Sequence, residues 1–263
     1  MLQMQGLVPL AEIEIEQNAV LQLKRQALLE ILNDQYKLNH YADPVVQAQA
    51  VLLNGIDPQL TQQLSQSIEA LIQNLASAKK YLKPRKFNAL QKWLGIDLDY
   101  GSGQVEYYKN LDRLLDQTNH LSQKLQIELQ KSQSRFQQLQ GLRKTMAQHI
   151  VAAEEFLIEY PSFGSQQFAM QHFSERLAKK IHSLRTLQSS NDIAIQQMLL
   201  SQQLSLSLLD RFKEAQQVLI PAWQYHVKQS LQQHNARDVE QLNQSREKLI
   251  RSLKHSLADF DKK

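Results

Sequence analysis

The feature that most constrains the fold is an apolar stripe that runs through residues 104–159. Its members follow one another at intervals of three, four or seven residues, which places them on one face of an α-helix. They are Leu111, Leu114, Leu121, Leu125, Leu129, Phe136, Leu139, Leu142, Met146, Ile150 and Leu157. A helix of ~55 residues is about 80 Å long. Such a helix is stable only when partner helices cover its stripe, so the sequence predicts a bundle of long helices.

Later segments can supply these partners. The residues Tyr160–Gly164 include Pro161 and Gly164 and predict a turn, after which an apolar helical face resumes up to Leu187. At residues 189–192 the sequence is compatible with either a break in this helix or a solvated bend. Residues 193–220 are apolar on more than one face, which is typical of a helix packed between others. A last amphipathic helix contains Leu242, Leu249, Ile250, Leu253 and Leu257.

The first third of the chain predicts shorter helices. Asp43–Pro44 and Asp57–Pro58 are helix-start signals, because Asp can cap free amides and Pro fits the first turn. Asn54–Gly55 predicts a helix end between them. Gly101 and Gly103 make a continuous helix unfavourable, so residues 97–103 are predicted to be a linker. We therefore expect an N-terminal helical region over 1–96, a linker over 97–103 and a long-helix bundle over 104–263.

Composition supports an all-α fold class. Together with the apolar stripes and the predicted turn, it favours an elongated antiparallel helical bundle with coiled-coil-like helices. Only 7 Gly and 6 Pro interrupt the chain, and Gln, Leu, Lys, Glu and Ala are abundant. The absence of Cys excludes disulfides, a cysteine nucleophile and thiolate metal sites. The N-terminus has no pattern of a secretory signal, and no window approaches the ~20 apolar residues that span a bilayer. These features predict a cytoplasmic protein.

Motifs that carry enzyme chemistry are missing from the sequence. The eight histidines form no H-E-x-x-H pair, and none has the E-x-x-H spacing of di-iron bundles. The start Asp97-x-Asp99-x-Gly101 resembles a calcium loop, but its twelfth position is Tyr108 rather than Glu. No phosphate loop and no nucleophile elbow occurs. We expect a protein that is not an enzyme and that binds neither a metal nor a cofactor.

One charged segment stands out between Glu69 and Asp97, where no acidic residue occurs. Aromatic residues lie among its cations, and such a segment could bind phosphates, lipid headgroups or an acidic protein surface. The alternative is that the aromatic residues pack inward and the charges are only solvated. The cations are Lys79, Lys80, Lys83, Arg85, Lys86 and Lys92. A second group, Arg176, Lys179, Lys180 and Arg185, is expected to form a solvated helix face.

Two stretches of the sequence resemble a known family. Ile193-Ala194-Ile195-Gln196 leads into Ile220-Pro221-Ala222-Trp223-Gln224, and the helix before it contains 142–149 followed by 152–157. This pattern is similar to the TelA/KlaA toxic-anion-resistance family over about residues 80–255. The chain departs from the family at Ala222, where Leu is usual, and at Gln202-Gln203, where Asn pairs are usual. The resemblance implies a part in tolerance of tellurite and other toxic anions within a bacterial stress response.

The sequence therefore favours a helical scaffold or adaptor that acts through protein–protein interactions, with partners of unknown identity and a possible homodimer through the long helices. Pro221 and Trp223 would mark a helix kink in the bundle core or a docking point. The alternative is a peripheral membrane or nucleic-acid binding protein that uses the basic segment 79–92. The two alternatives predict different responses to salt, because only the second depends on exposed charge.

Overall fold

The computed structural model describes the backbone of residues 7–32, 34–82, 96–159, 167–225 and 236–258, and side chains over most of these ranges. The described residues contain helices and no strand, which confirms the all-α fold class. Two helices are far longer than the rest: α7, Ile96–Glu159, and α8, Gln167–Glu214. The long stripe thus produces one continuous helix, as predicted, while the expected turn at 160–164 lies outside the described residues.

The linker that we expected at 97–103 is helical in the structure, because α7 begins at Ile96. Two glycines cost a helix about 1 kcal/mol each relative to alanine. The helix α8 likewise continues through 189–192 without a break. Local breaker residues were outweighed in both places by the helix that surrounds them.

The chain forms two compact units, each built from segments that lie far apart in the sequence. Unit 1 comprises residues 1–55 and 131–200, and unit 2 comprises residues 56–130 and 201–263. The division falls inside α7 and α8 and not at the predicted linker. Both long helices therefore contribute one part to each unit.

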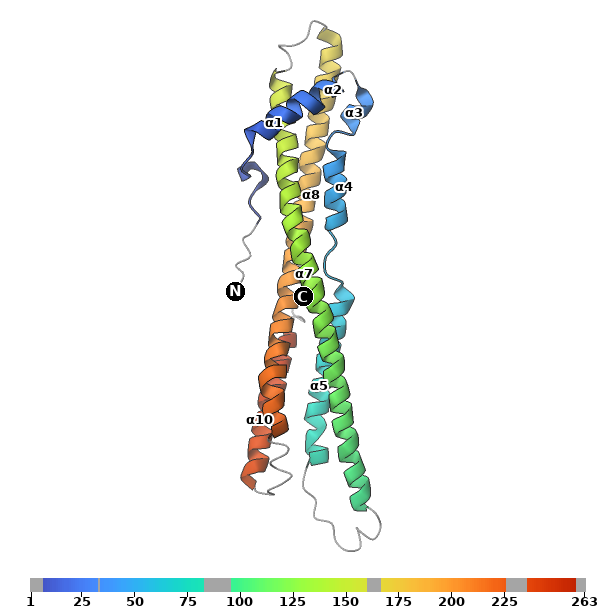
Figure 1. Cartoon of the computed structure of the whole chain (residues 1–263), viewed down its shortest axis with the longest axis vertical. Helices are drawn as coiled ribbons and strands as arrows, with labels where there is room; N and C mark the ends of the chain where they lie inside the picture. The colour runs from blue at the N-terminus through green and yellow to red at the C-terminus, as the bar shows by residue number, and fades with distance from the viewer. Residues whose placement is uncertain (1–6, 33, 83–95, 160–166, 226–235, 259–263) are drawn as a thin grey trace. The chain divides into compact units, whose positions relative to one another are not determined.

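In unit 1, short N-terminal helices pack on the second part of α7 and the first part of α8 (Figure 1). A helix begins at Asp43–Pro44 as predicted, but Asp43 does not cap it: the N-cap is Ala42, which adopts a left-handed conformation with φ of 64°, and no side chain caps the helix. Buried side chains from all these elements form one core, and Phe156 and Phe173 meet in it edge to face. The short helices are η1 Leu10–Glu12, α1 Gln17–Leu23, the π-helical turn η2 Lys24–Leu28, α2 Leu29–Ile31, α3 Gln35–Asn39 and α4 Asp43–Leu52.

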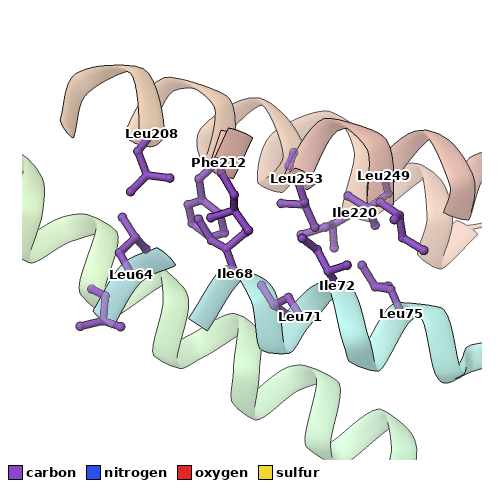
Figure 2. Packing of buried hydrophobic residues seen from close by; sticks show 14 of the residues in the cluster. Leu64, Ile68, Leu71, Ile72, Leu75, Leu208, Phe212, Ile220, Leu249 and Leu253 are labelled. Atoms are coloured by element: carbon purple, nitrogen blue, oxygen red, sulfur yellow. The ribbon is translucent and has the colours of Figure 1, made fainter. Parts of the chain in front are cut away.

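In unit 2, four segments share a core: α5, Pro58–Leu82, the first part of α7, the end of α8 with the π-helical turn η4, Ala215–Leu219, and α10, Ala236–Ala258. Asp57 accepts a hydrogen bond from the backbone of Gln59 and so caps α5, as its sequence predicted. Figure 2 shows the apolar row of α5 facing side chains of α8 and α10. The labelled residues are Leu64, Ile68, Leu71, Ile72, Leu75, Leu208, Phe212, Ile220, Leu249 and Leu253.

Candidate functional site

The basic segment that we singled out lies largely outside the described residues. Lys79 and Lys80 belong to the last turns of α5, where only the backbone is described. Lys83, Arg85, Lys86 and Lys92 fall within 83–95, outside the described residues. Binding of an anionic partner by these six cations therefore stays a prediction from the sequence.

Pro221 and Trp223 lie directly after the π-helical turn η4. The backbone N–H of Ile220 donates to the carbonyl of Ala215, five residues earlier, which is the hydrogen bond of a π-turn. Pro221 is exposed, whereas Trp223 is fully buried in the core of unit 2. Trp223 thus contributes to packing, and only Pro221 faces solvent.

A buried polar network crosses the interior of unit 1. The Arg143 guanidinium donates two hydrogen bonds of 2.7 Å to the two carboxylate oxygens of Asp192. Gln188 donates to the same carboxylate at 2.6 Å and accepts at 2.9 Å from Gln49, which in turn accepts at 2.7 Å from Asn191. The network joins α4, α7 and α8. The contacts of Arg143 with Asp192 and of Gln49 with Gln188 and Asn191 each link two helices, whereas the contact of Gln188 with Asp192 lies within α8.

The N-terminal helices carry further charges against the long helices of unit 1. Lys24, in the π-turn η2, donates to Glu159 at 2.6 Å and to Glu155 at 3.1 Å. Burial lowers the pKa of Lys24, but the hydrogen bonds and charges of Glu159 and Glu155 outweigh this effect, so its pKa lies above the ordinary value. The ammonium therefore stays charged and ties the first helices to α7.

The second cationic group, which we expected to be solvated, is largely paired. Lys180 donates to the Asp43 carboxylate at 2.9 Å, and Arg185 contacts Glu154 at 2.5 Å. Burial raises the pKa of Asp43, yet its contacts with Lys180 and His40 bring it below the ordinary value. Apart from Lys179, these cations hold segments of unit 1 together.

Half-buried His149 and buried Tyr41 form an aromatic pair in unit 1. Their ring centroids are 5.1 Å apart in an edge-to-face arrangement, and the Tyr41 hydroxyl donates to the His149 carbonyl at 2.9 Å. The Nδ1 atom of His149 is buried without a hydrogen-bond partner. Burial lowers the pKa of His149, so the neutral imidazole is favoured.

Unit 2 carries a hollow of about 460 Å³ between α5 and α7. Tyr107 forms its buried wall, and Asn74 and Ser77 of α5 lie opposite. The rim on α7 consists of Glu106, Lys109, Asn110 and Arg113. Burial raises the pKa of Tyr107 well above its usual range.

Arg246 of α10 lies close enough to Tyr107 that its charge lowers the pKa of that tyrosine, against the larger effect of burial. It is only 4% exposed. Its Nη2 atom donates to Glu247 at 2.9 Å, and its Nε atom is buried without a partner. The buried hydroxyl of Tyr108, whose ring lies 5.6 Å from that of Tyr107, also has no partner.

The buried charges were not recognised as such from the sequence, although a signal was present. Arg143 follows Leu139 by four residues and precedes Met146 by three, so it occupies a position of the apolar stripe. Arg246 lies in the same way between Leu242 and Leu249. A single polar residue at an apolar position of a helix indicates a buried polar contact, whose partner the periodicity does not reveal.

Within the described ranges, no group of three or more His, Asp or Glu residues is placed to hold a metal ion. No described helix is both long and apolar enough to cross a lipid bilayer.

Comparison with known proteins finds a relative that covers most of the chain. Protein KlaA of Escherichia coli is 29% identical to it over 202 residues, which cover 74% of this chain and 77% of KlaA. The chain is thus similar to a TelA/KlaA protein over about three quarters of its length. This confirms the resemblance drawn from Ile193–Gln196 and Ile220–Gln224. No family model matches the chain, and no solved structure matches it.

Proposed function

We propose that the chain is a helical adaptor of toxic-anion resistance, which acts in the cytoplasm by binding another protein. The similarity to KlaA, a protein of the TelA type, supports the link to resistance. The adaptor role rests on one observation in unit 1. The helix α8 exposes Ile193 by 59% and Leu200 by 43%, while Ile195 and Met198 between them are buried.

Ile193 and Leu200 are seven residues apart, so they lie on the same face of α8. Exposed Gln197 lies between them, four residues after the first and three before the second. Single exposed apolar residues are common on protein surfaces, but a pair at heptad spacing is the pattern that a partner helix covers. The partner that fits this face is therefore an amphipathic helix of another protein.

The test uses the double variant I193E/L200E, with V51E as the matched control. Val51 is 70% exposed on α4 and belongs to no such pair, so V51E adds a charge to unit 1 without touching the face on α8. Neither variant buries its new charge, so both are expected to fold as the wild type. Each is expressed in a host whose own copy of the gene is deleted, and tellurite tolerance and co-purified proteins are measured.

We expect I193E/L200E to lose tellurite tolerance together with one protein that the wild type and V51E both retain. Full tolerance in the I193E/L200E strain would exclude the face on α8 from the function. Equal loss in V51E would show that added charge, and not the face, is responsible.

The alternative of a membrane or nucleic-acid binder rests on the basic segment alone. It predicts binding to anionic vesicles or DNA that weakens steeply with salt and disappears when Lys79, Lys80, Lys83, Arg85, Lys86 and Lys92 are replaced by Glu. Salt-insensitive behaviour of the wild type would remove this alternative.

A further inference from the structure

The helical residues that include and follow the π-turn η4 expose a second apolar face, which belongs to unit 2. Val218 is 60% exposed and Tyr225 is 64% exposed. Pro221 and Ala222, three and four residues after Val218, are exposed as well, whereas Trp223 is buried. Spacings of three, four and seven residues place these four side chains on one side of a helix, which we call the 218–225 face.

The 218–225 face differs in charge from another exposed helix surface of unit 2. No Asp, Glu, Lys or Arg occurs in the sequence between Glu214 and Lys228. The exposed side of α10, by contrast, carries Glu247, Lys248 and Arg251. Apolar and tyrosine side chains without charges are typical of the centre of a protein–protein interface. The 218–225 face therefore has the composition of a surface that another protein surface covers.

The arrangement of this face is complementary to itself. Its centre lies between Pro221 and Ala222, and a larger side chain, Val218 or Tyr225, lies at each end. A two-fold rotation about this centre places Val218 of one copy against Tyr225 of a second copy. The small side chain of Ala222 in the middle allows the two helices to approach closely. An uncharged face also meets no like charge when it pairs with itself.

Charges beside the face favour one direction of pairing. Asp210 and Glu214 are exposed on the turns of α8 that precede it. In a parallel pair these carboxylates of the two copies would lie side by side and repel each other, whereas an antiparallel pair keeps them at opposite ends. Exposed Gln217 and Gln224 border the face, and amides can both donate to and accept from a copy of themselves. We propose that the 218–225 face binds the same face of a second copy of this chain in antiparallel orientation.

The small size of the contact sets the expected affinity. Two turns of one helix bury much less than the roughly 800 Å² that each partner contributes to a stable interface of standard size. Contacts of this size belong to weak and transient complexes, so the Kd of the dimer is expected to be on the order of 100 µM. The dimer uses neither Ile193 nor Leu200 of unit 1, so it is independent of the adaptor function proposed above.

Sedimentation equilibrium of the full chain, over about 5 to 500 µM, measures the association. V218E and Y225K each place an unpaired charge against an apolar side chain, twice in every dimer, and should weaken the Kd at least about tenfold. V218E/Y225K should recover most of this loss, because in an antiparallel pair the new carboxylate of one copy faces the new ammonium of the other. The matched control is I127E, because Ile127 is a 52% exposed residue of unit 2 outside the face, one turn after exposed Lys124.

We expect the control I127E to associate as the wild type does, and likewise I193E/L200E, so that dimer and adaptor function can fail separately. A wild type that stays monomeric over the whole range would overturn the proposal, and so would an unchanged Kd in V218E. A double variant V218E/Y225K that associates no better than the single variants would reject the antiparallel orientation.

A second measurement needs no added charge and so covers the case in which those variants do not fold. The chain contains no Cys, so one introduced cysteine reports its own distance from a second copy. The cysteine of A222C lies next to the two-fold centre and should form a disulfide-linked dimer when diamide is added as oxidant. The two cysteines of V218C would lie about 10 Å apart along the antiparallel helices, which exceeds the ~7 Å between Cα atoms that a disulfide allows. Absence of a cross-link in A222C would exclude the interface, and equal cross-linking of V218C would exclude its antiparallel geometry.

Discussion

Arg143 and Asp192 carry opposite charges into the interior of unit 1, where their side chains are only 5% and 21% exposed. Removal of two charges from water costs several kcal/mol each, and the mutual attraction repays this cost only in good geometry. The two hydrogen bonds of 2.7 Å and the additional bond from Gln188 supply that geometry. The pair therefore adds little net stability but disfavours any packing in which one partner is left alone.

The first prediction follows from the difference between losing one charge of this pair and replacing both. D192A leaves Arg143, only 4% exposed, without its counter-ion and should lower the free energy of unfolding by about 3–5 kcal/mol. R143M should cost less, because the Asp192 side chain is 21% exposed and can reach water. The double variant R143M/D192L should approach the wild type. Urea denaturation measures all three, with E175A on the exposed face of α8 as the neutral control. Equal costs for both single variants would contradict the argument.

His149 gives a second prediction, on pH dependence. Its pKa is lowered by burial, whereas in the unfolded chain it is about 6.5. Between these two values the unfolded state binds more protons, so the stability contributed by His149 rises with pH and is lost as the pH falls below about 6.5. H149N removes this group, so its melting temperature should fall less than that of the wild type between pH 7.5 and 5.5. Parallel curves for the two proteins would contradict the assignment.

At the scale of elements, the two π-turns adjust helices that are otherwise regular. One extra residue in a turn rotates everything after it by about 100° relative to a regular helix. The turn η4 lies directly before Pro221, which lacks an N–H and would clash in a regular helix with the carbonyl four residues earlier. The wider turn accommodates this ring while Ile220 and Trp223 still reach the core.

The third prediction concerns this turn. Deletion of Val218, which is 60% exposed, should convert η4 to regular helix and keep the later side chains in the core. The deletion alone should lower the free energy of unfolding by about 3 kcal/mol, because Pro221 would then clash within a regular helix. Adding P221A to the deletion should recover most of that loss. Deletion of exposed Gln203 from regular helix should instead rotate Trp223 out of the core. Fluorescence of Trp223 in a W93F background reports the difference; equal emission shifts for both deletions would reject the π-turn explanation.

Regular helices were the part of the fold that sequence patterns predicted best. The stripes of α5, α7 and α10 and the Asp–Pro starts of α4 and α5 are local signals, and each appears in the structure as expected. The glycines at 101 and 103 are equally local, but the helix on both sides overrode them. The helix propensity of a few residues decides whether they are helical only where the flanking residues have no strong preference of their own.

For the whole molecule, the decisive contacts join residues more than a hundred positions apart. Lys24 meets Glu155 across 131 positions, and Gln49 meets Gln188 across 139. Each unit is built from two such distant segments, so no boundary in the sequence marks the division. The glycine-rich segment therefore does not mark the boundary between the units. That boundary is set by which helices pack together.

The sequence by itself determined that the chain is helical, where most long helices run, which side chains share a face, and that it resembles TelA/KlaA proteins. Tertiary structure alone decided which faces meet, and hence that Arg143, Asp192, Gln49 and Gln188 form one buried network and that Arg246 lies near Tyr107. The reason is physical: periodicity arises within a single helix, while burial of a polar group depends on a partner that any distant segment can supply.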